Sequence, residues 1–417
     1  MILAPINNCR ICGNDNLIKV LDLGEQALTG VFPLSKSQQI THGPLHLLKC
    51  HSQIDKVCGL LQLAHSYDPG EMYGDNYGYR SSLNSSMVRH LNEKIKRTLE
   101  IVNLSSGDLV IDIGSNDSTT LQAFPNLGLK LVGIDPTGEK FKEYYPPYIK
   151  LISNFFSIKI FREHFSDQKA KVVTSFSMFY DLESPIDFMC DVRDILELEG
   201  IWVFEQSYMP TMLERNSYDT VCHEHLEYYG LHQIKWMTDK VGLRIIDVEF
   251  NDINGGSFSV TVAHSNSSYS VFSGLEELLD RELRLGLDTL KPYQDFAKRV
   301  INCRSDLLNF FKSSHLIGKK VFALGASSKG NVILQYCKIT DKEICFIGEI
   351  NSDKIGSFTP GSLIPIISEQ EVLSKEPDYL IVLPWHFRDF LINNKKYNGF
   401  HLVFPLPYLQ IINFDNP

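Results

Sequence analysis

The chain has 417 residues, which is too long for one ordinary hydrophobic core and suits two or three domains. Asp and Glu number 50 against 40 Lys and Arg, and the formal charge of −10 argues against a broadly basic surface for nucleic acid. No apolar run approaches the ~18–20 residues that span a bilayer, and the first residues lack the pattern of a signal peptide. We therefore expect a cytoplasmic protein that binds neither nucleic acid nor membranes, whose nine cysteines are thiols or metal ligands.

Four of these cysteines lie within residues 1–85, a segment whose short β-like pieces provide little apolar core. Cys9 and Cys12 form a CxxC pair, whereas Cys50 and Cys58 are separated by seven residues. Four thiolates would hold a structural zinc ion, because a site of four cysteines leaves no open coordination position. The alternative is a redox or accidental CxxC with Cys50 and Cys58 as core thiols, although the segment lacks a thioredoxin-like βαβ unit.

A helix and then an alternation of strands and helices are predicted after this module. Apolar residues recur every three or four positions from Met87 to about Glu100, which indicates an amphipathic helix. Near-continuous apolar runs separated by helical stretches then predict a parallel sheet covered on both faces. The runs expected to form strands span residues 109–113, 130–135, 171–176, 200–205, 244–248 and 257–262.

Helix is predicted again over residues 270–315, and a second strand–helix series follows it. Its strands are expected at residues 320–325, 343–348, 378–384 and 401–405. The expected fold class is therefore α/β. We expect a cysteine-bearing module at 1–85, a first α/β domain at 86–265, and a helical connector with a smaller α/β domain at 266–417.

The turn that follows the first strand of the middle domain occupies the position of a ligand-binding loop in an open α/β sheet. It does not read GxGxxG, which disfavours a diphosphate threading the turn and favours an adenosine held by Gly114 and polar side chains. Asp135, after the second strand, is placed to accept hydrogen bonds from ribose hydroxyls. An ordinary strand-to-helix turn is the alternative, but the two strand-end acids favour S-adenosylmethionine. The residues expected to contact this cofactor are Asp112, Gly114, Ser115, Asn116, Asp135, Phe156 and Ser177.

Residues 218–225, which end in Cys-His-Glu-His, also lie beyond the carboxyl end of a predicted strand. Histidine and glutamate suit proton transfer, because the pKa of histidine lies near working pH. A metal site and a solvated loop are the alternatives. Adjacent His-Glu-His residues alternate sides in an extended chain, and the segment lacks the i, i+4 histidine pair of a zincin helix.

Several segments in a fixed order complete the pattern. They are the Cys9/Cys12 knuckle, Leu21–Gly24, Cys58–Leu63, Met72–Ser82, Ile113–Asp117, Phe204–Glu205, Asp219–His225, Gly255–Phe258, Gly325–Asn331 and Pro360–Ile366. Together they resemble the sugar C-methyltransferases that act on nucleotide-linked 4-keto-deoxysugars, over nearly the whole chain.

The resemblance implies a class I methyltransferase (Rossmann-like) domain between a zinc-binding N-terminal module and a second Rossmann-like domain. It implies zinc on the four cysteines and S-adenosylmethionine in the middle domain. A dTDP- or GDP-linked sugar would lie between the N-terminal and middle domains, with help from the C-terminal one. We expect a monomer or weak homodimer.

In the active site, the resemblance matches His225 to the family's proposed base, Glu224 to its neighbouring acid and Tyr77 to an active-site tyrosine. A hydrogen on carbon beside a ketone is weakly acidic. We therefore expect His225 to remove it, Glu224 to orient the imidazole and Tyr77 to donate to the enolate oxygen. The carbanion, expected at C-3, then attacks the sulfonium methyl group. Further substrate contacts are expected from Tyr79, Arg80 and Cys222.

The turn Gly325–Asn331 follows a strand and opens a helix, so its amides and lysine would bind an anion such as the sugar-nucleotide diphosphate. A tight turn with an exposed lysine is the alternative. The contacts expected from this turn are Ser328, Lys329 and Asn331. Trp385 either stacks on a base or fills the domain interface, and the second is slightly favoured.

Some positions depart from the family. Some members have His at the position of Asp181 and Tyr at that of Cys222, and the turn usually ends in Gly where this chain has Ser118. Asp181 and Cys222 border the site, so the sugar and the enolate partner can differ. The rival functions are a sugar O-methyltransferase, a nicotinamide-dependent sugar oxidoreductase, whose glycine fingerprint is incomplete in this chain, and an inactive zinc-stabilised binding protein.

Overall fold

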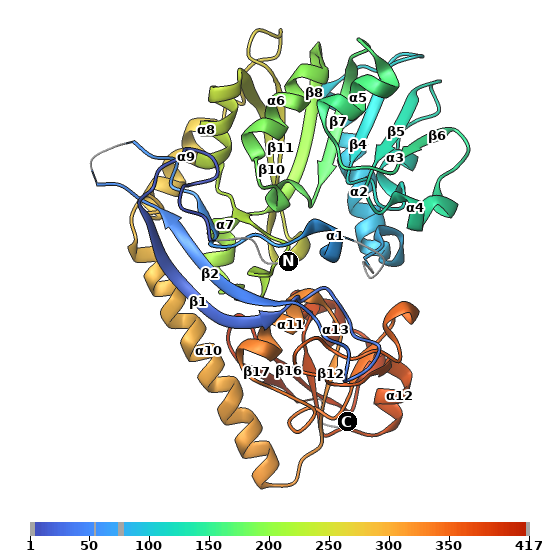
Figure 1. The fold of residues 1–417 in the computed structure, drawn as a ribbon. Coiled ribbons are helices and arrows are strands. Elements are labelled where there is room, and N and C mark those ends of the chain that lie inside the picture. The colour runs from blue at the N-terminus through green and yellow to red at the C-terminus, as the bar shows by residue number, and fades with distance from the viewer. Residues whose placement is uncertain (1–4, 54–55, 74–78, 414–417) are drawn as a thin grey trace.

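The computed structural model describes residues 5–53, 56–73 and 79–413, which form three sheets (Figure 1). The N-terminal sheet is antiparallel, in the order β1-β2-β3-β9. Its strands are β1 (Leu17–Ala27), β2 (His42–Cys50), β3 (Leu61–Leu63) and β9 (Glu227–Tyr228). Because β9 comes from the middle of the chain, shortly after the His-Glu-His segment, the N-terminal module and the candidate catalytic segment share one sheet.

A seven-stranded sheet carries the predicted cofactor loop, in the order β10-β11-β8-β7-β4-β5-β6. Its strands are β4 (Leu109–Ile113), β5 (Lys130–Ile134), β6 (Ile149–Ile152), β7 (Ala170–Phe176), β8 (Leu196–Ser207), β10 (Leu243–Asn251) and β11 (Ser257–His264). The expectation of an all-parallel sheet is wrong at one edge, because β11 runs antiparallel to both β8 and β10. The short turn between β10 and β11 permits only a hairpin, whereas parallel neighbours need a long crossover. The sequence pattern also misses β6, a four-residue edge strand.

Helices cover both faces of this sheet. On one face, α2 (Ser85–Ile101) and α3 (Thr119–Gln122) share a core with its strands. On the other face lie α5 (Ile158–Phe165), α6 (Pro185–Ile195) and α8 (Leu231–Val241). The shorter helices are α1 (Pro69–Met72), α4 (Gly138–Phe141) and α7 (Met209–Glu214). The amphipathic helix predicted at 87–100 is α2, and it is confirmed.

A six-stranded sheet, in the order β14-β13-β12-β15-β16-β17, forms the last domain. Its strands are β12 (Val321–Leu324), β13 (Ile347–Glu349), β14 (Ile366–Ser368), β15 (Tyr379–Val382), β16 (His401–Phe404) and β17 (Gln410–Ile412). Its helices are α11 (Ser328–Tyr336), α12 (Glu369–Ser374) and α13 (Arg388–Ile392). All strands are parallel except β17 at the edge. Three of the four predicted strands are present, and the strand predicted at residues 343–348 is confined to β13, which starts at Ile347. The sequence pattern misses β14 and β17, which with three residues each are too short to show a period.

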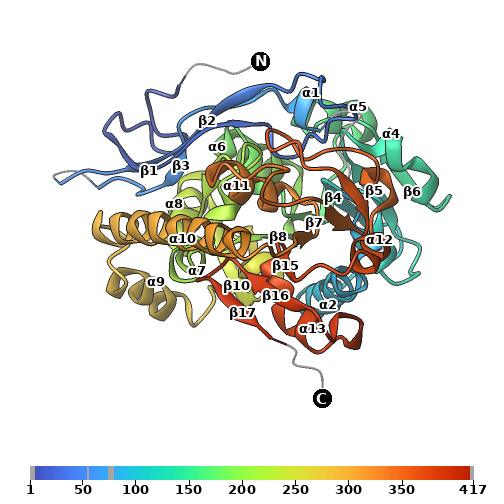
Figure 2. The same ribbon diagram turned by 90° about the horizontal axis from the view of Figure 1, so that it is seen from below.

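The predicted helical connector consists of two helices that pack into different hydrophobic cores. Leu275 and Leu279 of α9 (Leu275–Arg284) pack into the core of the seven-stranded domain. Val300 and Leu307 of α10 (Lys291–Leu316) pack into a core shared by the N-terminal and six-stranded sheets. Figure 2 shows β1 and β2 along one side of both α/β domains, with β17 on the opposite side. Within the described part of the chain, no helix is long and apolar enough to cross a membrane.

Candidate active site and metal centre

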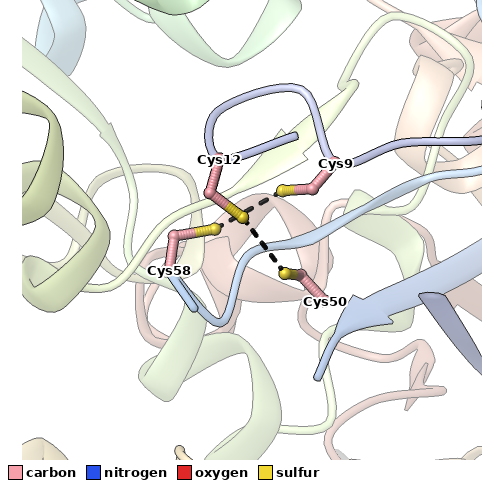
Figure 3. A group of neighbouring side chains, drawn as sticks. All are labelled: Cys9, Cys12, Cys50 and Cys58. Atoms are coloured by element: carbon pink, nitrogen blue, oxygen red, sulfur yellow. Dashed lines mark hydrogen bonds between the residues drawn. The ribbon is translucent and has the colours of Figure 1, made fainter. Parts of the chain in front are cut away.

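The four cysteines of the N-terminal module converge on one point (Figure 3). The Sγ atoms of Cys9 and Cys58 are 3.4 Å apart, those of Cys12 and Cys50 are 3.5 Å apart, and all four lie within 4.8 Å of one another. A tetrahedral zinc site with Zn–S bonds of about 2.3 Å has sulfur–sulfur edges of about 3.8 Å, so the cluster fits a zinc ion. A disulfide is excluded, because its sulfurs would lie about 2 Å apart.

Antiparallel pairing brings the widely spaced second pair together. Cys50 ends β2, and its amide donates to the carbonyl of Leu60 (2.8 Å), which places Cys58 across the hairpin. The Leu60 amide lies 3.4 Å from the Cys58 sulfur, and Nδ2 of Asn14 lies 3.3 Å from the Cys50 sulfur. Such donors stabilise thiolates. The seven-residue gap therefore does not disqualify Cys50, and all four cysteines form a structural zinc site.

A cavity of about 280 Å³ opens at the carboxyl edge of the seven-stranded sheet. The seven residues predicted to contact the cofactor all line it, namely Asp112, Gly114, Ser115, Asn116, Asp135, Phe156 and Ser177. Pro69 of α1, Met87 of α2 and the partly exposed Tyr79 also line it. The fold thus gathers residues from several strand ends into one hollow, where their contact with S-adenosylmethionine stays a prediction.

Asp135 holds the turn after β4 in shape. Its Oδ2 accepts a hydrogen bond from the Asn116 amide (2.7 Å), and its Oδ1 accepts from the amide and hydroxyl of Thr137 (2.6 Å each). The turn begins at Gly114, whose φ of 75° is a left-handed conformation that favours glycine. Asp135 therefore shapes the cavity in addition to the ribose contact that we predict for it.

Asp112 lies on β4 and is 2% exposed. The hydroxyl of Thr174 donates to its Oδ1 at 2.6 Å. Burial, reinforced by the charge of Asp135, raises the pKa of Asp112 to about 7. Near neutral pH this carboxyl is therefore protonated in a substantial fraction of molecules.

The segment Tyr79–Ser82 is fastened to the turn beside the cavity. Oδ1 of Asn116 accepts from the Ser81 amide and its Nδ2 donates to the Tyr79 carbonyl, both at 3.0 Å. Oδ2 of Asp117 accepts from the Ser82 amide at 2.9 Å. The Asn116 side chain therefore positions Tyr79 at the cavity.

The other predicted substrate residues of the first two domains are placed differently. Arg80 donates to the hydroxyl of Tyr144, and its guanidinium carbon lies 4.4 Å from the centre of that ring, so it packs within the middle domain. Cys222 is buried, and burial raises the pKa of its thiol. Tyr77, the predicted donor to the enolate, lies outside the described residues.

His225 has the tautomer of a general base. Its Nδ1 lies 2.9 Å from the carbonyl oxygen of Thr220, and because a carbonyl only accepts, Nδ1 carries the proton and Nε2 is basic. Burial and the positive charge of Lys329 lower the pKa of His225 to about 3, so the ring is neutral at physiological pH. The imidazole lies against Tyr180, with ring centres 4.2 Å apart.

The backbone links His225 to the cavity wall. The amide of Leu226 donates to the carbonyl of Tyr180 at 2.8 Å. Tyr180 belongs to the short helix η3 (Phe179–Asp181), whose last residue lines the cavity. His225 itself does not line the cavity, and η3 lies between the two, with Tyr180 against His225 and Asp181 at the cavity.

Glu224 does not orient the imidazole, which corrects the predicted division of roles. Its Oε2 accepts from the hydroxyl of Thr29 (3.2 Å), and its Oε1 lies against Gly30 of the N-terminal module. His223 points to a third place, where its Nε2 lies 3.3 Å from the carbonyl of Gly43. The three side chains of the His-Glu-His segment thus diverge, which excludes a metal site formed by these three residues, and the carbonyl of Thr220 orients His225.

The residues that open α11 face the other two domains. Nδ2 of Asn331 donates to the Thr29 carbonyl (2.7 Å), and Nζ of Lys329 donates to the Asn254 carbonyl (2.8 Å). Oγ of Ser328 lies beside Gly30. Asn331 is fully buried, so it fastens the C-terminal domain to the N-terminal module, and this contact competes with its predicted role at a diphosphate.

Sequence reasoning missed several groups at this junction. Trp385 fills the interface, as favoured, but its partner Asp219, which accepts from Nε1 at 2.8 Å, was not foreseen. Nor was Tyr73, whose hydroxyl donates to Oδ2 of Asp181 at 2.7 Å. These pairs are far apart in the chain, so no local pattern could have revealed them.

Three family models match successive parts of the chain. They are described as "Putative zinc binding domain" over residues 9–73, "Methyltransferase domain" over residues 83–248, and "C-methyltransferase C-terminal domain" over residues 252–407. Among curated proteins, the C-methyltransferase NovU of Streptomyces niveus is 28% identical over 423 residues, covering 100% of this chain and 99% of NovU.

Solved structures match a smaller share of the chain, and more distantly. The CcbJ methyltransferase from Streptomyces caelestis is 12% identical, with 42% of this chain and 90% of that chain covered and a TM-score of 0.33. An S-adenosylmethionine-dependent methyltransferase from Clostridium acetobutylicum is 11% identical, with 43% and 92% covered and a TM-score of 0.33.

Proposed function

The chain belongs to the S-adenosylmethionine-dependent C-methyltransferases that join a zinc-binding module, a methyltransferase domain and a C-methyltransferase C-terminal domain, and from this premise we propose its substrate and mechanism. We propose that it methylates C-3 of a nucleotide-linked 4-keto-deoxysugar. The residues that line the cavity at the carboxyl edge of the seven-stranded sheet would hold S-adenosylmethionine, which would supply an electrophilic methyl group on a sulfonium. The protein's own task is to turn the neighbouring carbon of the sugar into a nucleophile.

The observation that carries this proposal is the state of His225. Its Nδ1 proton is held by the Thr220 carbonyl, which leaves the lone pair of Nε2 free, and burial with the charge of Lys329 lowers the pKa of the ring and so keeps it neutral at neutral pH. Such a base removes the hydrogen beside a ketone, and the electron pair moves onto the carbonyl oxygen as an enolate. The carbon then attacks the methyl group. A donor to the enolate oxygen lowers the barrier further.

The charge of Lys329 supports a proposed position for the nucleotide part of the substrate. Lys329 uses one of three ammonium hydrogens on the Asn254 carbonyl, so two remain for an anion. Together with the amides of the first turn of α11, these hydrogens suit a diphosphate. The three domains meet at this point, and we propose that the sugar-nucleotide lies along their junction.

The free cysteines support a proposal for the cellular compartment. The five cysteines outside the metal cluster are free thiols, which suits a reducing compartment, and we propose the cytoplasm. We propose a monomer or weak homodimer.

Replacing His225 by Ala tests the mechanism. We expect turnover on a dTDP- or GDP-linked 4-keto-deoxysugar to fall at least ~100-fold, with S-adenosylhomocysteine affinity within two-fold of wild type. The exposed His164→Ala is the matched control and should be unchanged. Proton–deuterium exchange at C-3 without cofactor should also be lost in His225→Ala. A product methylated on oxygen, or His225→Ala turnover within a few-fold of wild type, would disprove the proposal.

A further inference from the structure

The buried carboxyl group of Asp181 has one oxygen atom without a hydrogen-bond partner among the described residues. The hydroxyl of Tyr73 donates to its Oδ2 at 2.7 Å. Its Oδ1 is shielded from solvent and has no hydrogen-bond partner among residues 5–53, 56–73 and 79–413. Buried polar atoms of proteins are nearly always hydrogen-bonded, so an orphaned oxygen at a cavity wall indicates a ligand atom. Both Asp181 and Tyr73 line the cofactor cavity.

Asp181 is the chain neighbour of the residue that packs against the candidate base. It follows Tyr180, whose ring lies 4.2 Å from that of His225 and whose carbonyl accepts from Leu226. A substrate carbon within reach of His225 would therefore have its carbonyl oxygen near the same wall segment. The base and the orphaned oxygen are suited to act on two neighbouring atoms of one substrate.

The charges around Asp181 favour its protonated form. Burial, together with the acidic group of Glu224, raises the pKa of Asp181 well above its ordinary value, against the opposing hydrogen bond from Tyr73. Glu183 lies at the same cavity, and the charge of Asp181 is also felt at Glu227. No cation faces Asp181 in its described surroundings, since the Arg10 guanidinium lies against Glu183 and Glu227. A neutral carboxyl has one hydrogen to donate.

We propose that Asp181, protonated on Oδ1 and held by Tyr73, donates the hydrogen bond that stabilises the enolate oxygen of the keto substrate. This rests on the proposed function. Nε2 of His225 takes the proton from carbon, and the C–H electron pair moves through the carbon–carbon bond onto the oxygen, where it meets the Asp181 hydrogen. When the carbon attacks, the new C–C bond forms, the S–CH₃ bond breaks, and the oxygen returns to a carbonyl. Asp181 keeps its proton throughout, so no further reagent is consumed.

The arrangement resembles the general case in which an apolar site keeps a carboxylic acid neutral so that it can serve as an oxyanion donor. Tyr73 is then a positioning residue. Asp181 itself is a catalytic residue, because it touches the reacting oxygen.

Three variants and a control test the proposal. Asp181→Ala should lower both kcat and C-3 proton exchange by about 100- to 1000-fold, the loss expected for one oxyanion donor. Wild-type activity should decline at high pH, where Asp181 loses its proton. Asp181→Asn, whose amide still donates, should retain activity within about ten-fold and should not show this decline. Tyr73→Phe should move that decline to higher pH, because it removes a hydrogen bond that favours the ionised carboxylate. The control is Asp187→Ala, at an exposed acid on the nearby helix α6.

A measurement on the resting enzyme separates this proposal from the proposed function. Carbon-13 labelling of aspartate, assigned by comparison with Asp181→Asn, should show the Asp181 carboxyl protonated at pH 7.5. An ionised carboxylate there would overturn the inference whatever the substrate. Asp181→Ala activity within three-fold of wild type would overturn it while leaving the proposed function intact. Wild type inactive on every keto-sugar, with a protonated Asp181, would sink the proposed function and, with it, the role of Asp181 as an enolate donor.

Discussion

The two α/β domains of this chain use the same device at equivalent strand ends. In the seven-stranded sheet, Asp135 follows β5 and accepts the amide of Asn116 in the turn after β4 (2.7 Å). In the six-stranded sheet, Glu349 ends β13 and accepts the amide of Ala326 in the turn after β12 (2.8 Å). Each acid also accepts an amide two residues further on, from Thr137 (2.6 Å) and Asn351 (2.9 Å).

The neighbours of the two turns differ, and this decides what each domain does. Around Asp135 the strand ends open into the cofactor cavity. Around Glu349 the turn is packed by Pro384, which a Cβ at Gly325 would approach within 2.6 Å, and Nζ of Lys354 donates to the Ala326 carbonyl (2.8 Å). The residues beyond that turn reach to the other domains, as Asn331 does. The same strand-end acid therefore serves a ligand cavity in one domain and domain docking in the other.

Loss of zinc should have the largest effect, because it should destabilise both α/β domains together. Cys9 and Cys58 share a core with the seven-stranded domain, and Leu21 and Leu47 of the same module share one with the six-stranded domain. Cys58→Ala should abolish bound zinc, measured by atomic absorption, and lower the thermal stability of the whole chain, because structural zinc contributes directly to folding. The exposed Cys345→Ala is the control, with full zinc and unchanged melting. Equal zinc content in both variants would contradict the four-cysteine site.

Replacing each of the two strand-end acids by alanine tests the comparison between the domains most directly. Asp135→Ala and Glu349→Ala should both destabilise the fold by about 1–3 kcal/mol, because each leaves buried amides without an acceptor. In titration calorimetry, Asp135→Ala should also weaken S-adenosylhomocysteine about 30-fold, or about 2 kcal/mol. Glu349→Ala should bind as wild type does. Equal loss of affinity would show that the second domain also takes the cofactor.

Two lysines of the six-stranded domain, Lys329 and Lys354, provide a smaller contrast. Lys329→Met should raise KM for the nucleotide-linked sugar about ten-fold, through loss of one charged contact of roughly 1.4 kcal/mol. It should also raise the pKa of His225, since the Lys329 charge lowers that pKa. Lys354→Met removes a hydrogen bond to Ala326 and a contact with the Phe32 ring, and it should change stability alone. Steady-state kinetics and melting curves separate the two, and an unchanged KM in Lys329→Met would remove the lysine from substrate binding.

The smallest effect concerns pH. Because the pKa of His225 falls from its ordinary value near 6.5 to about 3 on folding, the folded chain binds fewer protons between these limits. The contribution of His225 to the free energy of unfolding therefore rises from about pH 3 to 6.5 and is constant above that. The acid side of the kcat/KM profile, which reports the free enzyme, should show no decline centred near pH 6.5. A decline centred there would mean that the resting imidazole is exposed and charged.

The sequence was most informative where the physics is local. Apolar runs of four or more residues predict strands such as β4 and β12, because such runs can be buried only in a sheet core. The spacing of Cys9 and Cys12 indicates a metal site, because one short turn brings the two sulfur atoms together. The strand-end acids indicate a cofactor site in a similar way, since each follows directly after a predicted strand. The cavity residues from Asp112 to Ser177 come from several strand ends, and they were predictable because parallel strands end at one edge of a sheet.

Contacts between distant segments were decided only by the tertiary structure. The pairing of β9 with β3 joins the candidate catalytic segment to the zinc module. In the turn before β9, Glu224 contacts Thr29 and His225 contacts the carbonyl of Thr220. The Tyr73–Asp181 bond likewise needs two domains to be packed together. Side-chain direction and the burial that shifts a pKa depend on what covers each residue, and the covering segment has no fixed distance along the chain. The residue types therefore indicated the kind of chemistry, whereas tertiary packing determined which side chain has which contacts.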